Sequence, residues 1–181
     1  SQEVVFNALN DISNNTIDVS IVGEARTINP ATSVDGGGEF ITISANPFEV
    51  GDYVLYTTEG GNSATFGLSN NTFYWVITAN GSGVQLSTTA NGTAVDLTPG
   101  VNEWGHNLVG YINPYSDGDL LRYTVDTGNT ALTGLENRGE YYVVNSTPTT
   151  ISLSSTAGGN VINITAGSNE NGHNLARIIE E

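Results

Sequence analysis

The only two histidines of the chain lie in nearly identical segments, and each has a glutamate three residues before it. The segments read Asn-Glu-Trp-Gly-His-Asn-Leu at 102–108 and Asn-Glu-Asn-Gly-His-Asn-Leu at 169–175. On a helix, a Glu and a His at this spacing share one face, and they contribute ligands to di-iron sites. The pattern therefore suggests a duplicated catalytic site, a pair of metal sites, or a repeated piece of architecture.

The elements that would position these side chains are strands and turns rather than helices. Gly105 and Gly172 interrupt both segments, and strand-forming residues surround them. Residues three apart in a strand point to opposite faces, so the helical argument fails. A metal site would also need further ligands, and the chain has no other histidine and no cysteine. We therefore predict a turn that leads into a strand, with the histidine capping a backbone group.

A repeat with a period of 67 residues explains why the segment occurs twice. When Asn46-Pro47 is placed on Asn113-Pro114, about 26 of the 64 positions from 46 to 109 are identical without a gap. Ungapped identity at this level indicates an internal duplication. The sequence is therefore expected to fold as two similar modules.

The pattern of residue types predicts strands throughout the repeat. Short runs rich in Val, Ile, Thr, Tyr and Phe are bounded by Gly, Asn, Pro and Ser. The predicted strands are 40–43, 53–57, 72–78, 84–87, 94–97, 108–111, 120–125, 140–145, 151–154 and 161–165. No segment has convincing helical periodicity. The fold class is therefore all-β, with two tandem antiparallel modules of about five strands each, sandwich-like or barrel-like.

The same period places Gly38, Gly105 and Gly172 at equivalent positions, each followed by a strand-like segment. This predicts a boundary strand that opens the first module, joins the two modules and closes the second. The predicted domains are an N-terminal arm or extra strands at 1–37, a first module at 38–104 and a second module at 105–181. Residues Trp104, His106 and Leu108 would then lie at the module junction.

Residues 1–37 lie outside the repeat pattern and allow two interpretations. They could add strands that cover an edge of the first module, or form an arm that pairs with a neighbouring subunit, because an exposed sheet edge is a template for such pairing. The interface candidates in this segment are Val4, Val5, Phe6, Ile17, Val19 and Ile21.

Two further groups of residues could bind ligands. Asp52, Asp117 and Asp119 stand beside or near glycines, where Asp usually bonds its own backbone in a turn. A weak Ca²⁺ site is the alternative, because carboxylate oxygens suit this ion, and no other cofactor is expected. The aromatic pairs, Tyr74 with Trp75 and Tyr141 with Tyr142, are expected to pack in the core or between modules; their alternative is an exposed platform for a ligand or a partner.

The charge of the chain restricts its partners. Nineteen acidic residues stand against four arginines, and the formal net charge is -15. Such a surface repels phosphate, so binding to nucleic acid or to an anionic membrane is not expected. Motifs for a nucleophile elbow, a phosphate loop or a zinc protease are also missing, so no enzyme activity is predicted.

The repeat contains the pattern Gly-Asp-x-(Val/Leu)-x-Tyr, then Gly-Leu, then an aromatic pair with two aliphatic residues, then Leu-Ser-x-Thr. It appears as "GDYVLY…GLSNNTFYWVI…LSTT" and as "GDLLRY…GLENRGEYYVV…LSST". This pattern resembles a β repeat of tailed-phage virion proteins, notably of marine and cyanobacterial phages, that is also found in large bacterial adhesins.

The resemblance implies a non-enzymatic structural protein in the virion, most simply a capsid decoration protein or a subunit of a head, neck or tail appendage. Its partners would be capsid or appendage proteins and further copies of itself. The alternatives are a receptor- or glycan-binding adhesin, and an extracellular filament subunit joined by strand complementation.

Overall fold

The protein is almost entirely β-structure, as predicted, and it forms two modules. The computed structural model describes residues 3–63 and 66–179. They form two seven-stranded antiparallel sheets, each with its own hydrophobic core. Within the described residues, no helix has the length and hydrophobicity needed to cross a membrane. The all-β, two-module prediction is confirmed.

One module is continuous in sequence, and we call it the inserted module (residues 22–112). Its strand order is β4-β10-β7-β8-β9-β6-β5. The elements are β4 (Ile21–Ile28), α1 (Pro30–Ser33), β5 (Val34–Asp35), β6 (Phe40–Thr42), β7 (Tyr53–Thr58), β8 (Thr72–Asn80), β9 (Gly83–Ser87) and β10 (His106–Ile112). Strands from the middle and from both ends of this order bury side chains in one core, so the sheet curls around it.

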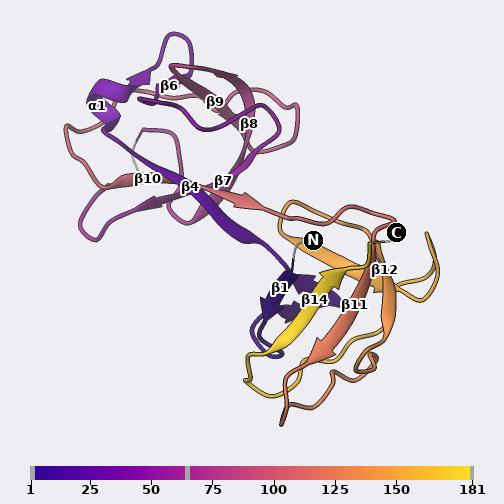
Figure 1. The fold of residues 1–181 in the computed structure, drawn as a ribbon. Coiled ribbons are helices and arrows are strands. Elements are labelled where there is room, and N and C mark those ends of the chain that lie inside the picture. Colours follow the sequence, from indigo (N-terminus) through magenta and orange to yellow (C-terminus); the bar gives the residue numbers. More distant parts are fainter. Residues whose placement is uncertain (1–2, 64–65, 180–181) are drawn as a thin grey trace. The chain divides into compact units, whose positions relative to one another are not determined.

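The other module consists of two separated pieces of chain, and we call it the split module (residues up to 21 and from 113). Its strand order is β1-β14-β11-β12-β13-β3-β2. The strands are β1 (Glu3–Phe6), β2 (Ile12–Ser13), β3 (Thr16–Asp18), β11 (Leu120–Val125), β12 (Glu140–Val144), β13 (Thr150–Ser154) and β14 (His173–Arg177). Figure 1 shows the first and last strands of the chain, β1 and β14, side by side in this module.

The predicted boundary between the modules does not match this division. Strand β10 pairs with the whole of β7, from His106 opposite Thr58 to Tyr111 opposite Tyr53. His106 and Leu108 are fully buried in the inserted module, and Trp104 precedes them on an exposed loop. These three residues therefore belong to the inserted module rather than to a junction. The chain instead crosses between modules near Ile21 and Asn113.

The N-terminal segment is divided between the two modules. Its strands β4 and β5 lie at the two edges of the inserted sheet, as the interpretation of extra edge strands predicted. Strand β1 pairs with β14 and β3 pairs with β13, so the part up to β3 completes the second repeat within its own chain. Among the interface candidates, the buried ones are Val4, Phe6, Ile17 and Val19, whereas Ile21 is half-buried and Val5 is exposed. The alternation arises because successive strand residues face opposite sides. The described part of this segment is thus core structure and not an arm free to pair with a neighbour.

The duplication extends into this N-terminal segment, where the sequence gives little sign of it. Asn7 donates from Nδ2 to Asn169 Oδ1, and Asn29 donates in the same way to Asn102 Oδ1. The two acceptors are 67 residues apart, as the repeat requires. The strand orders of the two sheets also correspond position by position. The chain therefore contains one copy of the fold inserted into a second copy, between β3 and β11.

Two predicted strands are absent from the sheets. Residues 94–97 keep one backbone hydrogen bond to β9, from Val95 N to Leu86 O, and residues 161–165 keep an equivalent bond from Ile162 N to Leu153 O. Side chains accept the next backbone hydrogen bonds in place of a neighbouring strand: Leu97 N donates to Glu39, and Ile164 N donates to Asn15. Both segments are therefore extended chain outside the sheets, and the second forms one isolated β-bridge, between Thr165 and Thr133.

Candidate functional site

Each histidine lies at the centre of a network of three side chains, in which the histidine and the tyrosine are buried and the glutamate is partly exposed. His106 Nδ1 is 2.6 Å from the hydroxyl of Tyr56, and its Nε2 is 2.9 Å from Glu103 Oε1. In the split module, His173 lies 2.7 Å from the Tyr123 hydroxyl and 2.9 Å from Glu170. Both histidines have no exposed surface. The predicted turn into a strand is present, but the histidine bonds two side chains instead of capping the backbone.

The hydrogen-bond pattern assigns the protons of this network. The Tyr123 hydroxyl accepts a 3.0 Å hydrogen bond from Leu132 N, so its own proton is available for His173 Nδ1. Nδ1 then accepts, and the Nε2 proton is donated to the Glu170 carboxylate. Burial raises the pKa of Tyr123 and of Tyr56, which keeps both hydroxyls protonated.

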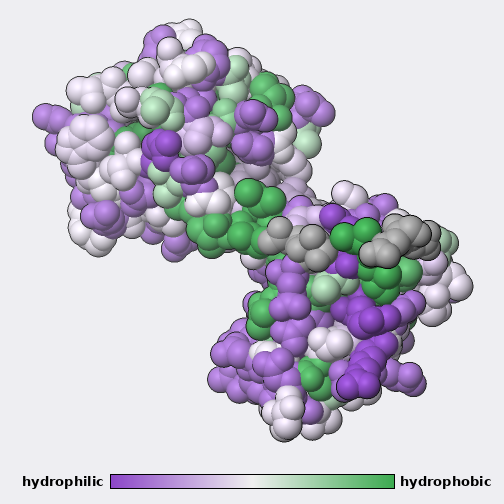
Figure 2. Space-filling model, in the orientation of Figure 1, coloured by the Kyte–Doolittle hydropathy of each residue, from purple (hydrophilic) through white to green (hydrophobic). Residues whose placement is uncertain are grey.

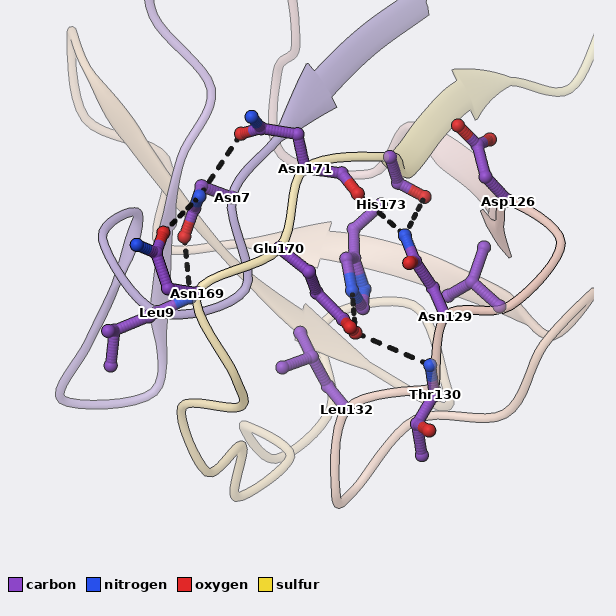
Figure 3. Close-up of polar contacts among 12 residues, drawn as sticks. Asn7, Leu9, Asp126, Asn129, Thr130, Leu132, Asn169, Glu170, Asn171 and His173 are labelled. Atoms are coloured by element: carbon purple, nitrogen blue, oxygen red, sulfur yellow. Dashed lines mark hydrogen bonds and ion pairs between the residues drawn. The ribbon is translucent and has the colours of Figure 1, made fainter.

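The glutamate of each network also holds the loop that follows β7 or β11. Glu170 Oε1 accepts from Thr130 N at 3.3 Å, and Asn129 Nδ2 donates to Asn171 O at 2.6 Å, so the loop is fixed to the segment before β14 (Figure 3). In the inserted module, Glu103 accepts from Ser63 N in the same way. A histidine with no exposed surface does not meet a substrate in this conformation. The arrangement therefore suits mechanical fixing of a loop.

We expect the Glu103 network to contribute stability that depends on pH. Hydrogen bonds from His106 and from Ser63 N lower the pKa of Glu103 below 4.5. A lowered folded-state pKa stabilises the protein above the unfolded pKa, and this stability is lost as the pH falls through the folded-state value. Glu103→Gln should therefore lower the melting temperature of the inserted module at pH 7, and the difference from wild type should shrink toward pH 3.

Thermal melts at a series of pH values measure this difference, and Glu49→Gln is the matched control. Glu49 is exposed, so its loss should change the melting temperature little at any pH. A difference between Glu103→Gln and wild type that stays constant from pH 7 to pH 3 would contradict the assignment.

Two of the three aspartates proposed as calcium ligands make hydrogen bonds within their own turns. Asp52 Oδ2 accepts from Glu49 N, and Asp119 Oδ2 accepts from Ser116 N, which matches the turn interpretation. Asp117 Oδ1 instead accepts from Ser146 N, 29 residues further along the chain. In the described ranges, 3–63 and 66–179, no group of three His, Cys, Asp or Glu side chains is placed to hold a metal ion.

The outer face of the inserted sheet carries an aromatic cluster, which we call the aromatic face (Tyr53, Phe73, Trp75 and Tyr111). The rings of Tyr53 and Phe73 stack at 4.7 Å between centroids, and Tyr53 lies 4.8 Å from Trp75. Phe73 meets Tyr111 edge-on at 5.1 Å. All four side chains are partly exposed, and they come from the adjacent strands β7, β8 and β10.

The structure divides each predicted aromatic pair between the two sides of its sheet. Tyr74 and Tyr141 point into the cores, whereas Trp75 and Tyr142 are partly exposed on the outer side. Tyr53 and Tyr111 complete the aromatic face but were absent from the predicted site. The alternation of side chains along a strand shows which residues share a face, but it could have grouped these two tyrosines with Trp75 only if the pairing of the three strands had been known.

The split module has a different outer face at the same positions. Arg122 and Glu140, which align with Leu55 and Phe73, form an ion pair at 2.7 Å. The two copies share strand order and core, so the fold does not require outward-facing aromatic rings. The visible surface is a mixture of hydrophilic and intermediate residues with a few hydrophobic patches (Figure 2). The aromatic face is therefore a specific property of the inserted module.

A pocket of about 110 Å³ adjoins the aromatic face. Its apolar wall includes Phe48, Tyr53 and Tyr111, and the acidic residues Glu24 and Asp52 also line it. Both acidic residues are exposed. The combination of apolar walls and negative charge suits a ligand that has a flat or apolar body and a positive charge.

Comparison of the chain with protein-family models, curated proteins and solved structures finds no significant match.

Proposed function

We propose that the chain is a non-enzymatic structural protein of a tailed-phage virion, a capsid decoration or appendage subunit that docks through the aromatic face. The observation that carries the docking surface is the contrast between two copies of one fold, of which only the inserted module presents a cluster of four aromatic rings outward. Tyr, Trp and Phe are enriched at protein interfaces because they bury a large area with few rotatable bonds. The virion assignment rests on the resemblance of the repeat.

The remaining properties agree with a subunit that is soluble before assembly. A net charge of -15 makes free subunits repel one another and favours a partner surface with positive charge.

A glycan-binding adhesin is the second candidate, and the exposed side of Trp75 favours it, because sugar rings stack on indole faces. The stacking of Tyr53 on Phe73 argues against a wide sugar platform, since each ring already covers one face of the other. A protein partner can also contact the edges of the rings, so all four rings of the aromatic face can contribute to protein docking.

Two experiments test the proposal. Antibodies against the purified chain should label virions of the phage that encodes it, and mass spectrometry of these particles should find the chain in multiple copies. Particles that lack the chain should bind the purified protein, and Trp75→Ala or Phe73→Ala should weaken this binding about tenfold or more, as expected for interface anchors.

Tyr142→Ala is the matched control, because Tyr142 aligns with Trp75 but lies on the outer face of the split module. It should leave binding to particles unchanged. Absence of the chain from virions would reject the virion assignment. Binding to a glycan array that depends on Trp75, without binding to particles, would instead support the adhesin.

A further inference from the structure

The split module binds a guanidinium group of its own chain. Arg177, on β14, places Nη2 2.9 Å from Asp119 Oδ2 and 2.6 Å from the backbone oxygen of Pro114. Its Cζ lies 5.7 Å from the centroid of the Tyr115 ring, within the range of a cation–π contact. A carboxylate, a carbonyl and an aromatic ring thus form a receptor for one arginine.

The inserted module has the same receptor without the arginine. Asp52, Pro47 and Phe48 stand 67 residues before Asp119, Pro114 and Tyr115. The position of Arg177 is taken by Gly110, which pairs with Val54 just as Arg177 pairs with Leu121. Gly110 has no side chain, and the pocket of about 110 Å³ lies beside it, lined by all three receptor residues.

From this correspondence we propose that the pocket binds an arginine side chain of a partner protein. The inference deepens the proposed function, because Tyr53 and Tyr111 belong to both the pocket and the aromatic face. An arginine held there would anchor a partner that covers the adjoining rings.

The receptor in the inserted module keeps the acceptors that an arginine needs. Asp119 Oδ2 accepts from Ser116 N at 2.9 Å and from Arg177 at the same time. Asp52 Oδ2 accepts from Glu49 N, also at 2.9 Å, so it retains the same capacity for a second donor. Glu24, a second acidic residue, also lines the pocket. The site is therefore complementary in charge to a cation.

The arginine of the inserted module itself is engaged elsewhere. Arg26 donates to the backbone oxygens of Ala25 and Ala45 and pairs with Glu24 at 3.2 Å. It does not line the pocket. A planar guanidinium also matches an aromatic wall better than the compact ammonium of lysine does. These points favour an arginine supplied by another molecule.

Titration of the full chain with N-acetyl-arginine methylamide tests the proposal. In amide NMR spectra, we expect saturable shifts at Asp52, Tyr53, Gly110 and Tyr111, with a Kd of roughly 1–10 mM. The corresponding lysine compound should bind at least about fivefold more weakly. Absence of saturable shifts at these amides, or equal binding of the two compounds, would overturn the assignment to arginine.

Two variants test the site itself. Gly110→Arg should supply the guanidinium in cis and abolish binding of the probe; an added Cβ would meet Phe48 Cε1 at 3.4 Å and Glu24 O at 3.5 Å, so the side chain can be placed. Asp52→Asn should weaken binding about tenfold, because it removes the charge of the acceptor. Asp119→Asn, the matched change in the split module, should leave probe binding unchanged.

Shifts that persist in both Gly110→Arg and Asp52→Asn would reject the pocket as the binding site. The titration involves no virion, so its failure is distinct from failure of the proposed function. If the probe does not bind while Trp75→Ala still prevents binding to particles, only the arginine pocket is rejected. If the probe binds as expected and the chain is absent from virions, the pocket stands and the virion assignment falls.

Discussion

Deletion of residues 1–20 is expected to unfold the split module and to leave the inserted module folded. The deleted segment places six buried apolar side chains in the core of the split module: Val4, Phe6, Ala8, Ile12, Ile17 and Val19. Full burial of a large apolar side chain stabilises a fold by about 1.5–3 kcal/mol. Together they contribute on the order of 10 kcal/mol, which is comparable to the whole stability of a small domain.

The deletion also removes the backbone hydrogen bonds of the outer strands at both edges of the sheet. Strand β14 loses its partner β1, and β13 loses its partner β3, so two inner strands become edges. Ala8 N and Ala8 O bond to Glu170 O and Gly167 N, and these contacts position the segment before His173. The remaining part of the split module therefore lacks both core and edge protection.

Calorimetry and limited proteolysis measure the outcome. The shortened chain should lose one thermal transition, and proteolysis should release a resistant fragment close to residues 22–112. A separate chain of residues 22–112 is the control, and it should melt at the temperature of the surviving transition. A peptide of residues 1–20, added in excess, should restore the lost transition. A shortened chain that keeps both transitions would contradict the assigned topology.

Much of the sheet structure could be predicted from sequence, because local alternation specifies strands. The predicted range 120–125 coincides with β11, and 53–57 and 84–87 fall within β7 and β9. The nested topology could not be predicted in this way. Strands β2 and β3 are only two and three residues long. They occupy the same places in their sheet as β5 and β6 do in the other, but their residues are not recognisably similar. Pairing between residues 3–6 and 173–176 is a long-range property that no local pattern contains.

The candidate sites were only partly visible in the sequence for a related reason. The Glu-x-x-His spacing identified two of the three residues of each network, but the tyrosine lies 50 residues before its histidine. Its repetition at Tyr56 and Tyr123 was a usable signal, since a buried tyrosine hydroxyl requires a partner. The arginine pocket was inferred from one difference between the two modules: Gly110 stands where the other module has Arg177. That difference points to a binding site only because the structure shows the same receptor residues around both positions.

The second large effect is expected for His106→Leu, which removes the centre of the network in the inserted module. Leucine fills much of the space, but the Tyr56 hydroxyl loses its buried acceptor, and Glu103 loses a charge-assisted hydrogen bond. An unpaired buried polar group costs about 1–3 kcal/mol. We therefore expect the free energy of unfolding of the inserted module to fall by about 1–3 kcal/mol, mainly through the buried Tyr56 hydroxyl.

Denaturant unfolding that resolves the two modules measures this change, and the split module provides an internal reference because its own network at His173 is intact. Trp104→Ala is the control within the inserted module: Trp104 lies two residues before His106 but is 63% exposed, and its loss should cost under about 0.5 kcal/mol. A fall of less than about 1 kcal/mol for His106→Leu would contradict the expectation.

A double-mutant cycle with Tyr56→Phe separates the network from simple packing. If the hydroxyl and the imidazole stabilise the module through their mutual hydrogen bond, the double variant should cost less than the sum of the single variants by about 1–3 kcal/mol. This follows because removing both partners leaves neither of them unpaired in the core. Additive costs would mean that the two side chains act only by filling space. In that case, the repetition of histidine in both modules would have to be explained by the bond to glutamate alone.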